Sequence, residues 1–206
     1  MMFLVTEDFK TFIKKYPITT VMVGICSILV IITTFTGGYT IQNIINLGGY
    51  EHELVNQGEI WRLFTYAFMH GSYAHFFMNM TFMIILGRPL ERVLGSLKFL
   101  LFYLTTVIIT GLIINFFYTP NTVETGASGV GYAFLGMYLF ITLFRKNMLF
   151  SDDRKFVITF LGIGLLSSLI IPSTSLTGHL AGLIIGFIIT PIVLNKASSF
   201  QNSVNV

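Results

Sequence analysis

The chain has 206 residues, of which 54% are hydrophobic and only 10% are charged, and its mean hydropathy is +0.79. This composition excludes an ordinary soluble domain and predicts a protein of the lipid bilayer. The net charge of +3 does not indicate nucleic-acid binding, because the basic residues lie between hydrophobic runs. The single cysteine, Cys26, excludes an internal disulfide and a cysteine cluster that could hold zinc or an iron–sulfur centre.

Membrane-spanning helices are predicted from stretches without acidic or basic residues, which are 16–50, 63–87, 99–123, 125–144 and 156–195. A spanning helix needs roughly 20 apolar residues, so the last stretch must hold two helices, separated by a turn at Pro172-Ser173-Thr174-Ser175. We therefore expect an all-α membrane protein with a six-transmembrane-helix bundle, formed as one domain over 1–206. The expected helices are 18–36, 73–92, 98–118, 127–144, 156–171 and 177–195, and the fifth is expected to be the shortest.

The stretch 37–72 is glycine-rich and carries Glu51, Glu53, Glu59 and Arg62, which predicts a large extramembrane loop. Trp61 in this loop suits the interface between lipid and water. If the N-terminus is cytoplasmic, eleven of the twelve basic residues also lie on the cytoplasmic side, and only Arg62 lies outside. This positive-inside asymmetry predicts that both termini are cytoplasmic. No cleaved signal peptide is expected.

A few strongly polar side chains fall at one expected depth, near the outer face. His70, His75 and Asn79 lie at the entry of the second helix, Ser128 begins the fourth, and His179 begins the sixth. Such groups are costly in a bilayer and are therefore functional candidates. His75 and Asn79 are four residues apart, so they share a helix face, as the donors of an oxyanion hole would. Interhelical hydrogen bonding is the structural alternative for this pair.

Ser128 lies in the sequence Gly126-Ala127-Ser128-Gly129-Val130-Gly131, where free N–H groups at a helix start can bind an anion. An isolated serine in such a segment is usually a packing residue. The nucleophile elbow of soluble hydrolases, G-x-S-x-G, is not matched, because position 130 is valine.

Small residues recur along the two helices that carry Ser128 and His179. They are Gly129, Ala133 and Gly136 on the fourth helix, and Gly178, Gly182 and Gly186 on the sixth. Stripes of this kind permit close helix contact. If the stripes face each other, His179 lies near Ser128 and a hydrogen bond could activate the hydroxyl. Tyr132, one turn from Ser128, could pack on the imidazole. Since no acidic residue lies within the last four helices, a Ser-His dyad is expected rather than a triad.

Taken together, four motifs resemble the rhomboid family of intramembrane serine proteases. They are Trp61-Arg62, His70 with His75-x-x-x-Asn79, Gly126-x-Ser128-Gly129, and Gly178-His179-x-x-Gly182. Rhomboids commonly have alanine before the catalytic histidine, where this chain has Gly178.

The resemblance implies that Ser128 is the nucleophile and His179 the general base. It implies that His75, Asn79 and the Ser128 backbone N–H form the oxyanion hole, with Tyr132 and Gly126 in supporting roles. It also implies a compact, multi-pass enzyme of the bacterial plasma membrane. Its partners would be single-span transmembrane substrates in the lipid bilayer, cut near the outer end of their span. Residues 156–176 would act as a gate.

Two alternatives stay open at this stage. An inactive rhomboid-like protein would bind transmembrane clients without cutting them. A transporter or metal enzyme would use His70, His75 and His179 as ligands, although no H-E-x-x-H motif is present. We expect no cofactor, no metal and no nucleic-acid partner. Structural roles are expected for His70, Trp61 and Arg62, and Glu91 is expected to anchor the inner end of its helix.

Overall fold

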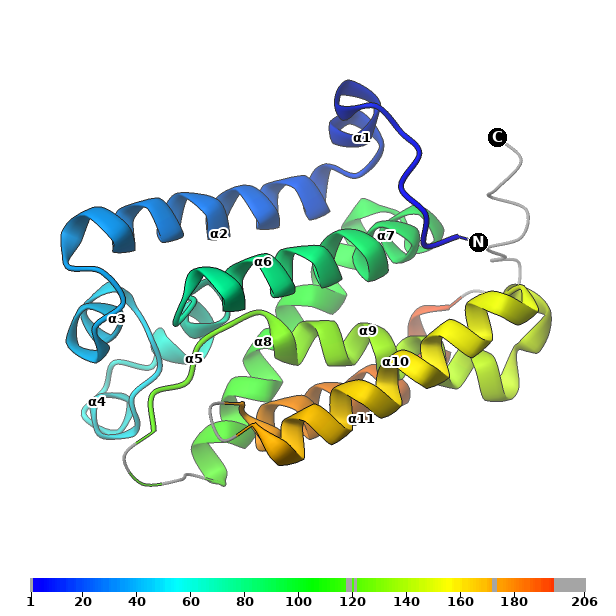
Figure 1. Cartoon of the computed structure of the whole chain (residues 1–206). Coiled ribbons are helices and arrows are strands. Elements are labelled where there is room, and N and C mark those ends of the chain that lie inside the picture. Colours follow the sequence, from blue (N-terminus) through cyan, green and yellow to red (C-terminus); the bar gives the residue numbers. More distant parts are fainter. Residues whose placement is uncertain (1, 118–119, 121, 172–173, 195–206) are drawn as a thin grey trace.

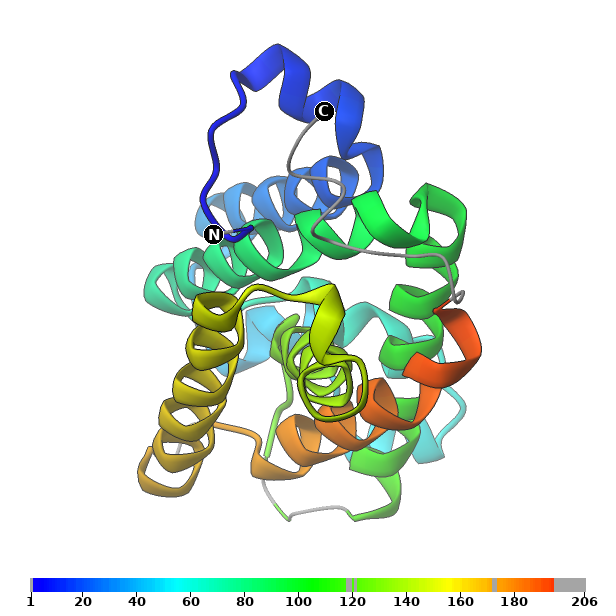
Figure 2. The same ribbon diagram turned by 90° about the vertical axis from the view of Figure 1, so that its right-hand side faces the viewer.

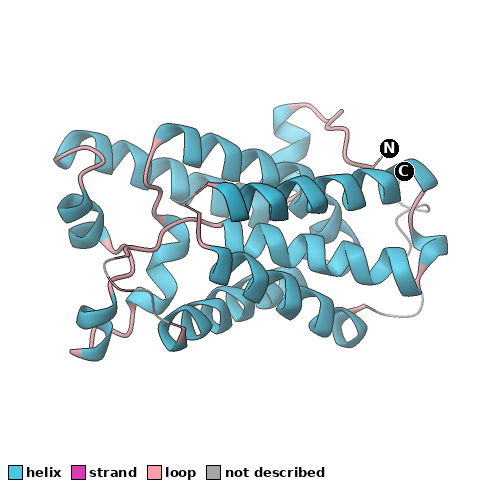
Figure 3. Cartoon of the chain, turned by 60° about the horizontal axis from the view of Figure 1, so that its bottom comes forward, coloured by secondary structure: helices cyan, strands magenta, loops and turns pink. Residues whose placement is uncertain are grey.

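The computed structural model describes residues 2–117, 120, 122–171 and 174–194, and within these ranges the protein is built from helices and loops (Figures 1 and 3). The described residues contain no β-strand, only an isolated antiparallel bridge between Tyr50 and Glu124. The helices are α1 (Phe9–Lys15), α2 (Pro17–Thr36), α3 (Ile41–Leu47), α4 (His52–Asn56), α5 (Arg62–Thr65), η1 (Tyr66–Phe68), α6 (Tyr73–Phe82), the π-helical turn η2 (Met83–Gly87), α7 (Arg88–Leu94), α8 (Ser96–Phe116), α9 (Ser128–Phe144), η3 (Lys146–Met148), α10 (Ser151–Ile170) and α11 (Leu176–Val193).

Helix α9 is the centre of the bundle. Viewed from the end in Figure 2, it lies in the middle, with α10 on one side and α8 on the other. Every residue from 129 to 138 is buried. A helix that is apolar all around its circumference is stable either in a protein core or in lipid. Packing against the neighbouring helices places α9 in the core.

The outside of the bundle is apolar. Three helices of the described chain, α2, α8 and α11, are long and apolar enough to cross a membrane, with mean hydropathies of 2.3, 2.2 and 2.0. Large side chains such as Ile28, Phe35 and Ile192 point outward. An apolar surface of this extent is not found on soluble monomers, so the chain is a multi-pass membrane protein.

Four of the predicted spans agree closely with the helices. Helices α2, α8, α9 and α11 begin within two residues of the predicted starts. The predicted ends of the third and sixth spans, at 118 and 195, lie outside the described residues, as does part of the predicted turn at 172–175. The predicted span 73–92 is interrupted by η2, just before Pro89. There the Tyr138 hydroxyl donates to the Leu86 carbonyl oxygen at 2.7 Å.

The prediction that the fifth helix is the shortest was wrong. Helix α10 has 20 residues, whereas α9 has 17 and α11 has 18. Helix α10 begins at Ser151, five residues before the charge-free stretch 156–195. Asp152 and Asp153 lie in this first turn, where the helix dipole favours negative charge. A charge-based prediction misses such a polar helical turn.

The segment 37–72, predicted as a large extramembrane loop, contains α3, α4, α5 and η1, which cap one end of the bundle (Figure 1). The buried side chain of Arg62 organises it. Arg62 Nη1 donates to the carbonyl oxygens of Ile45 at 2.6 Å and Gly49 at 2.7 Å. Arg62 also pairs with Glu59 at 2.7 Å. These bonds fix the segment that leads into α6.

The opposite end of the bundle is held by a second polar cluster. The buried Glu91 carboxylate accepts the backbone N–H groups of Ile18 at 2.9 Å and Thr19 at 2.8 Å. Ser96 also donates to it at 2.9 Å. The carboxylate thus joins the starts of α2 and α8 to α7.

Candidate active site

The contact between α9 and α11 is the closest helix packing in the site. A Cβ added at Gly182 would collide with the carbonyl oxygen of Gly129, and one at Gly186 would collide with that of Ala133. The two small-residue stripes therefore face each other, and backbone meets backbone. This contact brings the first turns of α9 and α11 together.

Ser128 and His179 meet at the outer end of this contact. Ser128 is the first residue of α9 and is half-buried, and His179 lies in the first turn of α11 and is buried. Ser128 Oγ and His179 Nε2 are 2.8 Å apart. Ser175 caps α11 by accepting the N–H of Gly178 at 3.2 Å. The separation is within hydrogen-bond range for a hydroxyl nucleophile and its base.

Two further side chains enclose the imidazole of His179. The ring of Tyr132 is stacked on it, with centroids 4.1 Å apart and an interplanar angle of 16°. Ser168 of α10 lies at the other nitrogen, with Oγ 2.7 Å from His179 Nδ1. Ser168 was not among the site residues predicted from the sequence. It is one of three hydroxyl residues in the apolar stretch 156–171, with Thr159 and Ser167, and no sequence pattern distinguishes it.

His75 and Asn79 lie around Gly126, two residues before Ser128. Gly126 has φ +108°, and a Cβ there would be 2.6 Å from His75 Nε2 and 3.8 Å from Asn79 Nδ2. The Gly71 N–H donates to His75 Nδ1 at 3.4 Å. Because a neutral imidazole carries one proton, this bond assigns the proton to Nε2, which then acts as a donor toward the Gly126 loop. Asn79 donates one N–H of its side-chain amide to the His75 carbonyl oxygen at 2.9 Å. The same amide has a second N–H that can donate to another acceptor.

His70 lies beside His75, with ring centroids 5.2 Å apart. Its Nδ1 donates to the Phe68 carbonyl oxygen at 3.2 Å, while its buried Nε2 has no hydrogen-bond partner among the described residues. Burial lowers the pKa of His70 to about 3, and the neighbouring His75 acts in the same direction. His70 is therefore neutral, and among the described residues its ring contacts are with His75 and Phe76.

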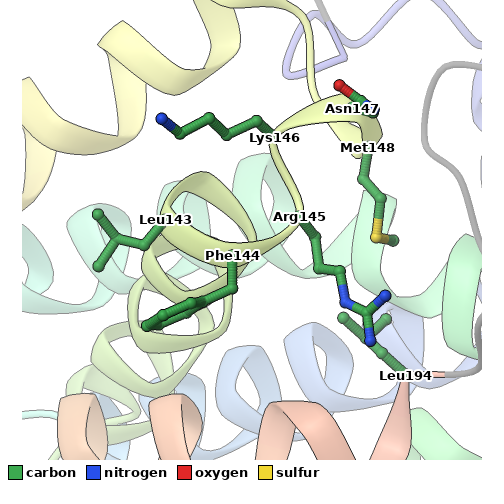
Figure 4. A pocket seen from close by; sticks show the side chains of 7 residues that line it. All are labelled: Leu143, Phe144, Arg145, Lys146, Asn147, Met148 and Leu194. Atoms are coloured by element: carbon green, nitrogen blue, oxygen red, sulfur yellow. The ribbon is translucent and has the colours of Figure 1, made fainter.

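The described residues do not form a metal site, since no three His, Cys, Asp or Glu side chains among them are grouped to hold an ion. A cavity of about 490 Å³ lies at the far end of α9 from Ser128 (Figure 4). It is lined by Leu143, Phe144, Arg145, Lys146, Asn147, Met148 and Leu194. This cavity is separate from the polar cluster around His179.

Known proteins resemble the chain over nearly its full length. Residues 57–196 match the family model of the rhomboid domain. The putative rhomboid protease YdcA of Bacillus subtilis is 33% identical over 196 residues, covering 95% of this chain and 98% of the relative. Rhomboid protease GlpG of Haemophilus influenzae is 29% identical over 183 residues, covering 87% and 92%. Rhomboid protease GluP of B. subtilis is 31% identical over 188 residues, which are 90% of this chain but 37% of the relative.

The fold and the polar cluster thus define an all-helical, multi-pass membrane protein with a serine and a histidine in contact on neighbouring helices. The chain belongs to the rhomboid family.

Proposed function

We propose that this protein is an intramembrane serine endopeptidase. The observation that carries the proposal is the 2.8 Å separation of Ser128 Oγ and His179 Nε2 between two helices locked together by glycines. The names of the relatives, which are rhomboid proteases, support it. The inactive rhomboid-like alternative is not favoured, because both chemical groups are present and in contact.

In the proposed reaction, Ser128 Oγ attacks the scissile carbonyl carbon while His179 Nε2 takes the hydroxyl proton. The negative charge that develops on the carbonyl oxygen is stabilised by hydrogen-bond donors. These donors are His75 Nε2–H, the free amide N–H of Asn79 and the Ser128 backbone N–H, which begins α9 and has no intrahelical acceptor.

His179 then gives its proton to the leaving amine nitrogen, and the C–N bond breaks to leave an acyl-enzyme. Water attacks this ester with His179 again as base, which releases the carboxylic acid and restores Ser128. No cofactor takes part. The groups that carry this sequence are a Ser-His dyad and its supporting side chains, Tyr132 and Gly126.

The proposed substrates are single-span transmembrane proteins, cut near the outer end of their span. The site lies at the end of the bundle that bears α3 to α5, and Arg62 is the one basic side chain in that segment. In this proposal the chain has six spans and cytoplasmic ends, and lies in a bacterial plasma membrane. Residues 156–176 form the gate through which substrate enters.

The dyad is tested with a fluorophosphonate probe, which reacts with activated serines. The wild-type protein should be labelled, and the label should disappear in Ser128→Ala and in His179→Ala. Ser167→Ala is the matched control, because its hydroxyl bonds only to the Gly164 carbonyl oxygen at 2.8 Å. Labelling that persists in both dyad variants would refute the assignment.

The activity is tested by incubating the purified protein in liposomes with a panel of single-span substrates. Cleavage by the wild type and not by Ser128→Ala is the expected result. Loss of cleavage with chelators, without loss with serine reagents, would replace this mechanism by metal-assisted hydrolysis.

A further inference from the structure

The hydroxyl of Ser168 has three close polar neighbours. Its Oγ is 2.7 Å from the Gly164 carbonyl oxygen, 2.7 Å from His179 Nδ1 and 2.9 Å from the Tyr132 hydroxyl. A serine hydroxyl has one proton to donate and two lone pairs that accept. Three neighbours therefore use its full hydrogen-bonding capacity.

The carbonyl oxygen decides where the Ser168 proton lies. A carbonyl can only accept, and two oxygens 2.7 Å apart without a proton between them would repel each other. The proton of Ser168 must therefore point to Gly164, in the back-bond that serine often makes to residue i−4 of a helix. Both lone pairs of Oγ then accept, one from Tyr132 and one from His179.

This arrangement fixes the tautomer of His179. To donate to Ser168, Nδ1 must carry the proton of the neutral imidazole, so Nε2 is left with a free lone pair. That lone pair faces Ser128 Oγ at 2.8 Å. The other tautomer would present an N–H to the Ser128 hydroxyl and could not remove its proton.

We propose that Ser168 is a positioning residue that holds His179 in the tautomer able to act as general base. This inference rests on the proposed function. Ser168 takes the position that a buried carboxylate occupies in serine triads, but it stays neutral and transfers no proton. When His179 becomes positively charged, the Nδ1–H···Oγ bond becomes charge-assisted and therefore stronger.

The hydrogen bond between Ser168 and His179 is buried, which raises the cost of losing it. Ser168, Tyr132 and His179 are only 5%, 6% and 7% exposed, so water competes poorly for their polar atoms. Removing the Ser168 hydroxyl would leave a buried N–H and a buried O–H without acceptors, which is costly. Space for the cluster depends on Gly164, since a Cβ there would lie 2.8 Å from the Tyr132 hydroxyl oxygen.

The first test reads the tautomer directly by nitrogen NMR of the histidine-labelled protein, with His179 assigned through His179→Gln. The wild type should carry the proton on Nδ1. Ser168→Ala should lose this preference, Ser168→Thr should keep it, and Ser167→Ala should not change it. A wild-type proton on Nε2, or an unchanged tautomer in Ser168→Ala, would overturn the proposal. The wild-type measurement does not depend on the folding of a Ser168 variant.

The second test measures cleavage. Losing one neutral hydrogen bond at the base should lower kcat about tenfold in Ser168→Ala and leave KM unchanged. Ser168→Thr should restore kcat, and Ser167→Ala should match the wild type. If Ser128→Ala abolishes cleavage while Ser168→Ala keeps full kcat, only the role of Ser168 fails. If the wild type cleaves nothing, the proposed function fails, and the tautomer is still decided by NMR.

Discussion

Gly182 lies so close to the carbonyl oxygen of Gly129 that no side chain fits between them. Gly129 directly follows Ser128, and Gly182 lies one turn after His179, so this contact holds the two residues of the Ser128–His179 hydrogen bond together.

Gly182→Ala should push α11 away from α9, because the backbone carbonyl it meets cannot rotate aside as a flexible side chain could. Overpacking of this kind costs about 1–3 kcal/mol of stability. The serine and histidine should separate, and probe labelling of Ser128 should fall sharply. Thermal unfolding in detergent and labelling rate measure the two effects. Gly162→Ala is the matched control, since a Cβ there has no atom within 4 Å. Equal behaviour of both variants would contradict this account.

Gly126→Ala should damage the site for two reasons, a left-handed φ of +108° and a collision with the His75 ring. Gly38→Ala is the control that isolates backbone strain. Gly38 also has a left-handed φ, +68°, but an added Cβ there would have no atom within 4 Å. Both variants should lose roughly 1 kcal/mol or more of stability through backbone strain. Only Gly126→Ala should lose cleavage, which the liposome assay measures. Full activity in Gly126→Ala would show that His75 is not needed near this loop.

Tyr132→Phe keeps the ring that stacks on His179 and removes the hydroxyl that bonds to Ser168 at 2.9 Å. The loss of one buried hydrogen bond should lower kcat by less than tenfold. Tyr132→Ala also removes the stacked ring, and should lower both kcat and the melting temperature much further. Steady-state cleavage assays measure kcat, and thermal unfolding measures the melting temperature. If Phe and Ala were equally harmful, the hydroxyl rather than the ring would be what holds the histidine.

Asn79→Ala should reduce kcat about 100-fold without changing KM, because an oxyanion donor acts mainly in the transition state. The variant also loses the side-chain bond to the His75 carbonyl oxygen. Thr81→Ala controls for that loss, since Thr81 makes the same type of bond to Phe77 at 2.8 Å on the same segment. Steady-state cleavage of both variants distinguishes the roles. A similar small effect in both would assign Asn79 to helix structure.

Acid should destabilise the protein in part through His70. The pKa of His70 is about 3 in the folded protein, whereas the ordinary value for histidine is 6.5. At a pH between these two values, His70 is protonated in the unfolded chain but not in the folded protein. The free energy of unfolding therefore falls as pH drops from about 6.5 to about 3. In His70→Asn, whose amide can still donate to the Phe68 carbonyl, this fall should be smaller. Melting temperatures of both proteins across this pH range test the prediction. If the melting temperature falls equally steeply with pH in His70→Asn, His70 does not contribute to the acid sensitivity.

The helices could be predicted from the sequence because lipid places the same demand on every span, an apolar surface with all backbone groups bonded internally. The π-helical turn at Met83–Gly87 could not, since it depends on how packing places Tyr138 against the Leu86 carbonyl. The length of α10 was missed because its first turn is polar.

Parts of the candidate site were predictable for a different reason. Glycines at intervals of four residues indicate a close helix contact, and this contact alone brings Ser128 and His179 together. Ser168 had no such pattern. Ser27 makes the same back-bond, to the Val23 carbonyl oxygen at 2.8 Å, and in sequence the two serines look alike. Only tertiary packing against α11 shows that one of them reaches a histidine.

The order of the chain has a consequence for biosynthesis. Ser128 and His179 are 51 residues apart, with Ser168 between them, and they belong to α9, α11 and α10. As the nascent chain leaves the ribosome and enters the bilayer, the proposed nucleophile arrives first and the proposed base last. Until α11 docks into its glycine contact with α9, the hydroxyl has no partner that can activate it. Under the proposed mechanism, the protein therefore cannot cleave neighbouring nascent membrane proteins until its own insertion is complete.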